Sequence, residues 1–125
     1  MQSRILKGEF YMPFIDVKLT KSITDAEAVA LKTKLGSLIE VFPGKSEGWL
    51  MCSIEDSKKM WFRGDNSDDS AFVEVKLYGT VNPEAADKFT GLLCNYLEEN
   101  LSISSDRIYV RYEGGSDWGW NGSNF

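Results

Sequence analysis

The residue with the most distinctive chemical potential is Pro13, which directly follows a methionine in the stretch Met12-Pro13-Phe14-Ile15-Asp16-Val17-Lys18-Leu19. If translation begins at Met12, that methionine is normally removed, because the next residue is small. The free secondary amine of Pro13 would then be a base near neutral pH, since α-amino groups titrate at about 7.7–8.0. In the chain as given, eleven residues precede Met12, and the Pro13 nitrogen is an amide without basicity. Base chemistry at Pro13 therefore depends on where the chain begins.

Residues 1–12 show no clear hydrophobic period and no helix cap. The tripeptide Lys7-Gly8-Glu9 can be encoded by a purine-rich sequence that resembles a bacterial ribosome-binding site. It would lie a few nucleotides before the Met12 codon, where such a sequence works. We therefore expect residues 1–12 to be a translated leader or, as the alternative, an N-terminal extension packed on the surface, and residues 13–125 to form the domain.

Composition excludes several other kinds of chemistry. The chain has no histidine, and Cys52 and Cys94 form no CxxC motif, so neither a common metal site nor a histidine-based triad is expected. A net charge of −5 argues against a nucleic-acid surface, which needs clustered cations. No apolar run reaches the roughly 20 residues that span a bilayer, and no signal peptide is present. We expect a cytoplasmic domain without cofactor or metal, with no nucleic-acid or membrane partner.

The elements that must position Pro13 alternate between strands and helices. Alternation of apolar and polar residues predicts a strand from residue 13 to 19. Thr24 and Glu27 form a capping-box pattern, which predicts that a helix begins there and runs to Phe42. A strand is predicted over residues 49–54, a polar loop over 64–70 and a strand over 71–79. Asn82 and Pro83 open a second helix. A strand at 107–113 and a short final strand near 118–121 complete the chain.

The order is strand-helix-strand twice, with corresponding positions offset by 58 residues. Two right-handed βαβ units can share a four-stranded sheet with both helices on one face. The predicted class is therefore α+β, with short edge strands added. The uncovered face carries apolar side chains, which indicates burial by self-association. These side chains belong to Phe14, Trp49, Met51, Phe72 and Tyr78.

In the order of several sequence segments, the chain resembles the tautomerase superfamily, specifically its branch similar to macrophage migration inhibitory factor. The resemblance covers residues 12–125, nearly the whole chain. The segments that carry it are residues 12–15, Gly44-Lys45, residues 91–94, residues 106–110 and residues 119–125. The resemblance implies a homotrimer with active sites between subunits, built around an N-terminal proline amine.

The resemblance also implies roles for individual residues. By position, Pro13 matches the catalytic base, Lys45 the pocket lysine and Tyr109 a tyrosine lent by the neighbouring subunit. Phe14, Tyr78, Trp118 and Arg111 would contribute to substrate binding, with Lys45 and Arg111 binding a carboxylate. The implied reaction is keto–enol tautomerisation of a phenylpyruvate-like 2-keto acid. Arg111 replaces an asparagine of the mammalian cytokines, and their CxxC motif is absent here, so redox activity is not expected.

Each of these residues also has a simpler interpretation. Lys45 follows a helix and would offset its dipole, and Tyr109 and Arg111 alternate on a strand where solvated side chains are common. Trp118 and Trp120 would pack at an interface. The alternative function is a non-catalytic binding protein or cytokine mimic on the same scaffold; a host receptor as partner has no support in the sequence.

Overall fold

The computed structural model describes residues 12–124, so the predictions made for residues 1–11 and for Phe125 lie outside the described residues. Four strands form one mixed sheet in the order β2-β1-β3-β4. Strands β1 and β2 are parallel, β3 and β4 are parallel, and β1 is antiparallel to β3. The strands are β1 (Phe14–Leu19), β2 (Met51–Glu55), β3 (Ala71–Lys76) and β4 (Ile108–Glu113). The predicted α+β class with two βαβ units is confirmed.

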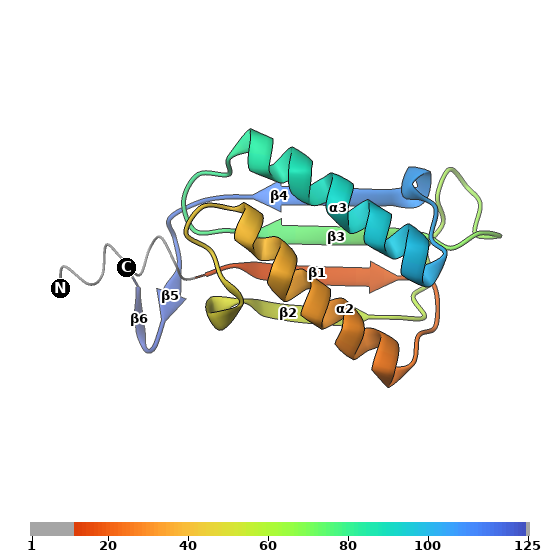
Figure 1. The fold of residues 1–125 in the computed structure, drawn as a ribbon, viewed down its shortest axis with the longest axis horizontal. Coiled ribbons are helices and arrows are strands. Elements are labelled where there is room, and N and C mark those ends of the chain that lie inside the picture. Colours follow the sequence, from red (N-terminus) through yellow and green to blue (C-terminus); the bar gives the residue numbers. More distant parts are fainter. Residues whose placement is uncertain (1–11, 125) are drawn as a thin grey trace.

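Two helices cover the same face of this sheet (Figure 1). Helix α2 (Asp25–Leu38) begins at the predicted capping box, in which the Thr24 hydroxyl accepts from the Glu27 backbone N–H and the Glu27 carboxylate accepts from the Thr24 N–H. Helix α3 (Pro83–Leu101) begins with proline in its first turn, and the Asn82 side chain accepts from the backbone N–H of Ala85. None of the helices among residues 12–124 is long and apolar enough to cross a membrane.

The hydrophobic core lies between the helices and the sheet. Alternate residues of each strand point into it because successive side chains of a strand face opposite sides. From α2, the 3-10 turn Ile39–Val41 that follows it and the next residue come Leu31, Leu35, Ile39 and Phe42, all at most 2% exposed. From α3 come Phe89, Leu93 and Leu97, and all three are fully buried. The strands contribute chiefly Ile15, Val17, Leu19, Val73 and Val75.

The opposite face of the sheet carries both apolar and charged side chains. Phe14 and Phe72 are partly buried there, whereas Met51 is 69% exposed and Tyr109 is 63% exposed. Between them lies Asp16, which is only 7% exposed and accepts hydrogen bonds from Lys18 and from Ser53. Burial raises the pKa of Asp16, but these hydrogen bonds and nearby lysine charges outweigh it and hold that pKa below its usual value.

Several predicted boundaries were wrong. The helix predicted to reach Phe42 ends as an α-helix at Leu38 and continues as a 3-10 turn over Ile39–Val41. Trp49 lies in a 3-10 turn, Glu47–Trp49, before β2, and Tyr78 lies beyond the end of β3. Arg107 lies in a third such turn, Ser105–Arg107, and not on β4. The predicted final strand is a two-stranded hairpin of β5 (Gly119–Trp120) and β6 (Ser123–Asn124).

The hydroxyl of Tyr112 is bound inside the layer between α3 and β4. It lies 2.6 Å from Thr90 Oγ1 and donates to the carbonyl oxygen of Ala86 at 2.9 Å. The ring packs against Phe42 and Phe89. Burial raises the pKa of Tyr112 to about 12 and outweighs the hydrogen bond with Thr90, which lowers it.

We therefore expect Tyr112 to titrate at a pH well above the usual tyrosine pKa of about 10 while the protein stays folded. Its neutral form stabilises the fold fully below pH 10, and this stabilisation is lost as the pH rises towards 12. The measurement is absorbance at 295 nm against pH, with circular dichroism to show that the fold persists. Tyr112→Phe should remove the late phase, and a late phase that survives this substitution would contradict the assignment.

Candidate active site

Pro13 lies immediately before β1, with β2 on one side and β3 on the other. Its carbonyl oxygen accepts a hydrogen bond from the backbone N–H of Met51 at 3.0 Å, which fixes it to β2. Pro13 is buried, and so is Met12, at 8% exposed. Met12 has φ +78°, a left-handed conformation that is rare for a residue with a side chain. The backbone therefore departs from the extended conformation at the residue before Pro13.

A pocket of about 530 Å³ opens at this position. Its wall is mostly apolar and contains three tryptophans contributed by segments far apart in the sequence. Trp49 and Trp120 pack edge to face, with ring centroids 5.4 Å apart, which joins the turn before β2 to the β5–β6 hairpin. The pocket is lined by Met12, Pro13, Phe14, Gly48, Trp49, Leu50, Met51, Lys76, Trp118, Gly119 and Trp120. Of the predicted site residues, Pro13, Phe14 and Trp118 thus come together.

Lys45 and Tyr78 are not among the residues that line this pocket. They are linked to each other, because the Lys45 ammonium donates a hydrogen bond to the carbonyl oxygen of Tyr78 at 3.2 Å. This bond joins the loop after α2 to the segment that follows β3. Figure 1 shows both of these segments at the end of the sheet where strand β1 begins. Lys45 and Tyr78 therefore lie at the same end of the sheet as Pro13.

Tyr109 and Arg111 lie on the outer strand β4, with two strands between them and β2. Both side chains are exposed on the face opposite the helices. The Tyr109 ring packs edge to face on Phe62, with centroids 5.4 Å apart. Neither residue lines the Pro13 pocket of its own chain. A Tyr109 side chain that contributes to the pocket of a neighbouring chain would need such an exposed position. This role of Tyr109 stays a prediction.

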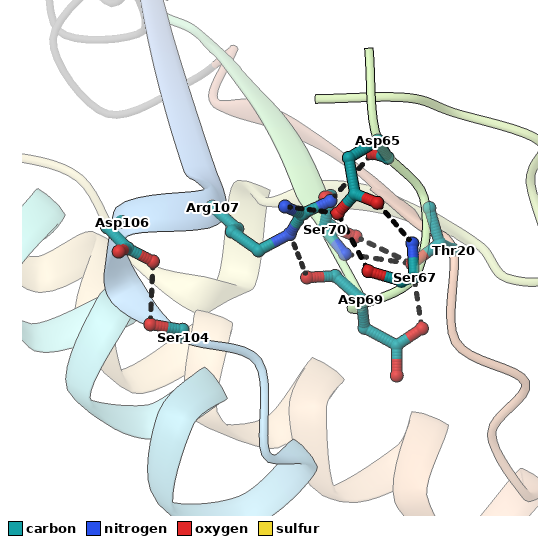
Figure 2. A network of polar contacts seen from close by, with 8 residues as sticks. All are labelled: Thr20, Asp65, Ser67, Asp69, Ser70, Ser104, Asp106 and Arg107. Atoms are coloured by element: carbon teal, nitrogen blue, oxygen red, sulfur yellow. Dashed lines mark hydrogen bonds and ion pairs between the residues drawn. The ribbon is translucent and has the colours of Figure 1, made fainter. Parts of the chain in front are cut away.

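Among residues 12–124, the buried cation is Arg107, which lies at the end of the sheet opposite Pro13 and was not recognised in the sequence. Arg107 is 8% exposed and binds the loop that precedes β3 (Figure 2). Its Nε donates to the Asp69 carbonyl oxygen at 3.1 Å and to Ser70 Oγ at 3.0 Å, and Nη2 donates to the Asp65 carbonyl oxygen at 2.9 Å. Nη1 lies 3.4 Å from an Asp65 carboxylate oxygen. The predicted solvated loop is therefore fixed by one arginine.

Within the part of the chain that the structure describes, the other reactive groups have no arrangement that suggests chemistry. Burial raises the pKa values of both cysteine thiols, Cys52 and Cys94, which disfavours the reactive thiolate form. Among residues 12–124, no group of three or more histidine, cysteine, aspartate or glutamate side chains is placed to hold a metal ion. The pocket beside Pro13 is accordingly the best candidate for an active site.

A sheet built from two βαβ units, with a proline buried at the start of an inner strand beside an aromatic pocket, defines a tautomerase-like α+β protein. The family model of macrophage migration inhibitory factor (MIF) matches residues 12–125, and the chain belongs to this family. The match begins at Met12, directly before Pro13.

Relatives in this family resemble the chain in sequence and in structure. The macrophage migration inhibitory factor of Xenopus tropicalis is 27% identical over 108 residues, covering 85% of this chain and 93% of the relative. The crystal structure of a MIF protein from Leishmania major has a TM-score of 0.83 and 28% identity, covering 92% of this chain and 98% of that one. A homologue from Prochlorococcus marinus has a TM-score of 0.72 and 32% identity, covering 90% and 98%.

Proposed function

We propose that this chain is a keto–enol tautomerase of phenylpyruvate-like 2-keto acids, with the amine of Pro13 as the base when Pro13 is N-terminal. The observation that carries the proposal is the position of Pro13, which is buried at the start of an inner strand and lines an aromatic pocket. Apolar surroundings depress the pKa of an amine, because they disfavour its charged form. They bring the base closer to the working pH, where general-base catalysis is most effective.

The reaction needs one base and one hydrogen-bond donor. The unprotonated amine takes a proton from the carbon next to the keto group, and the electrons of that C–H bond form the enol double bond. The carbonyl oxygen gains negative charge and then a proton, which the proline ammonium can return. A donor such as the Tyr109 hydroxyl stabilises the oxygen as this charge develops. The aromatic body of the substrate lies against Trp49 and Trp118.

Assembly as a homotrimer is part of the proposal. Tyr109 and Arg111 are exposed on β4 and away from the Pro13 pocket of their own chain, so a neighbouring chain must bring them to it. Met51 and Tyr109 also leave apolar surface exposed on the open face of the sheet, which association would bury. Residues 13–125 form the proposed domain, and the cytoplasm is the proposed location.

The test compares phenylpyruvate tautomerisation by a chain that starts at Pro13 with the same reaction by the 125-residue chain. The described core cluster lies between Ile15 and Ile108, so the shorter chain keeps all of it. Turnover is expected only in the shorter chain, because an amide nitrogen cannot accept the proton. Equal turnover by both chains would show that Pro13 is not the base.

A second candidate function is a non-catalytic MIF-like binding protein. The specific observation in its favour is that Pro13 is internal in the 125-residue chain, so its nitrogen is an amide. A folded Pro13-started protein without turnover on phenylpyruvate or related 2-keto acids would favour this alternative.

A further inference from the structure

Lys76 is a pocket residue to which the sequence analysis assigned no role. It is the last residue of β3 and pairs with Phe14 on β1 and with Glu113 on β4. Lys76 is among the residues that line the Pro13 pocket. It also lines an adjoining pocket of about 360 Å³, together with Glu113, Asp117 and Trp118. Lys76 and Trp118 thus form the wall that the two pockets share.

The ammonium of Lys76 has no ion-pair partner within the described part of the chain. Over residues 12–124 the ion pairs within 4.0 Å are made by Lys18, Lys58 and Arg107. Lys76 is partly buried. Its positive charge interacts electrostatically with Asp16 and helps to lower the pKa of that carboxyl group. A carboxylate that binds this ammonium makes a charge-assisted hydrogen bond, which is stronger than a hydrogen bond between neutral groups.

We propose that Lys76, and not Lys45, is the cation of the chain's own pocket that binds the carboxylate of the substrate, and that it selects aromatic monocarboxylates; Lys45 does not line this pocket and donates to the Tyr78 carbonyl oxygen. This inference rests on the function proposed above and names the group that recognises the substrate. The aromatic body lies against Trp49, Trp118 and Trp120, and the carboxylate faces Lys76. Negative charge from Glu113 and Asp117 in the adjoining pocket disfavours a second carboxylate on the substrate.

Binding is measured first, by tryptophan fluorescence and calorimetry, on the Pro13-started protein and in parallel on the 125-residue chain. The probes are 3-phenylpropionate, its neutral amide of the same shape, and phenylsuccinate as a dicarboxylate. None of them tautomerises, so this readout does not depend on turnover. The acid is expected to bind at least about tenfold more tightly than the amide, since hydrogen bonds to charged groups are the stronger ones. Phenylsuccinate is expected to bind more weakly than the monocarboxylate.

Lys76→Met is expected to weaken binding of the acid about ten- to hundredfold and to leave the amide unchanged. Lys76→Arg should restore most of the affinity because it keeps the cation. Lys88→Met is the matched control, because Lys88 is exposed on α3, on the far side of the sheet from the open face. Equal binding of acid and amide, or acid binding by Lys76→Met at wild-type strength, would overturn the inference.

Turnover separates this inference from the proposed function. In Lys76→Met, KM for phenylpyruvate should rise with little change in kcat, as expected for an interaction made equally in the ground and transition states. If the wild-type chain lacks turnover but binds the acid through Lys76, the tautomerase proposal fails and the anion site stands. If turnover is present and KM does not respond to Lys76→Met, the tautomerase proposal stands and this inference falls.

Discussion

A Pro13-started chain that receives one extra glycine in front of Pro13 is expected to lose about a hundred- to ten-thousandfold of kcat/KM, the range that general-base catalysis contributes. The added residue converts the secondary amine of Pro13 to an amide. The new terminal amine lies one residue farther along the chain, and consecutive Cα atoms are about 3.8 Å apart. General-base catalysis requires hydrogen-bond reach, so this displaced amine is a poor substitute.

Glycine is the appropriate residue for this test because Met12 has φ +78°. Glycine adopts positive φ without steric cost, so the added residue can follow the path of Met12. Because only one small residue is added, obstruction of the site is kept small and can be separated from loss of the base. Affinity for 3-phenylpropionate should change little and is the control. Turnover that survives the added glycine would contradict a base at Pro13.

Replacing Arg107 with methionine is expected to lower the free energy of unfolding by about 2–4 kcal/mol. The substitution keeps much of the side-chain length but removes the donors that satisfy the carbonyl oxygens of Asp65 and Asp69 and the Ser70 hydroxyl. Partly buried acceptors without donors are costly. Arg107 also packs over the Phe62 ring at 5.4 Å, a contact that methionine retains only in part.

The measurement is urea unfolding at one fixed protein concentration, because association makes stability depend on concentration. Arg107→Lys should fall between the wild type and Arg107→Met, since an ammonium keeps the charge but cannot span three acceptors in one plane. The surface control Lys88→Met should stay within about 0.5 kcal/mol. A wild-type midpoint for Arg107→Met would show that the loop before β3 does not depend on this guanidinium.

The parts of the fold that the sequence predicted correctly depend on local signals. The capping box of Thr24 and Glu27 fixed the start of α2, and Asn82 with Pro83 fixed the start of α3, because each pattern satisfies free backbone N–H groups within a few residues. The strands were found from alternation, which also gave the end of β1 at Leu19 and the start of β3 at Ala71, but several other strand ends were wrong because they depend on pairing with distant strands. Tyr78 was placed on β3 for this reason, although the β3–β4 pairing ends at Lys76.

The candidate site could be predicted only in part. Pro13, Phe14 and Trp118, which were named through the resemblance and not through periodicity, line the candidate pocket. Lys76 was missed because alternation places it with other solvated strand residues, and no local signal shows that its neighbours form a pocket. Arg107 was missed because its partners are 37–42 residues away in the sequence, and only the folded chain brings them together.

The central position of β1 has a consequence for how this protein folds. Within the described sheet, β1 is the strand that joins the two βαβ halves, through its antiparallel pairing with β3. Forming that strand pair closes a loop of more than 50 residues. We therefore expect this seam, the paired β1 and β3, to form after the local contacts of each half. Pro13 occupies the start of this seam. Any partly folded state in which the halves have separated therefore lacks a formed pocket, and activity reports on the intact domain and never on one half.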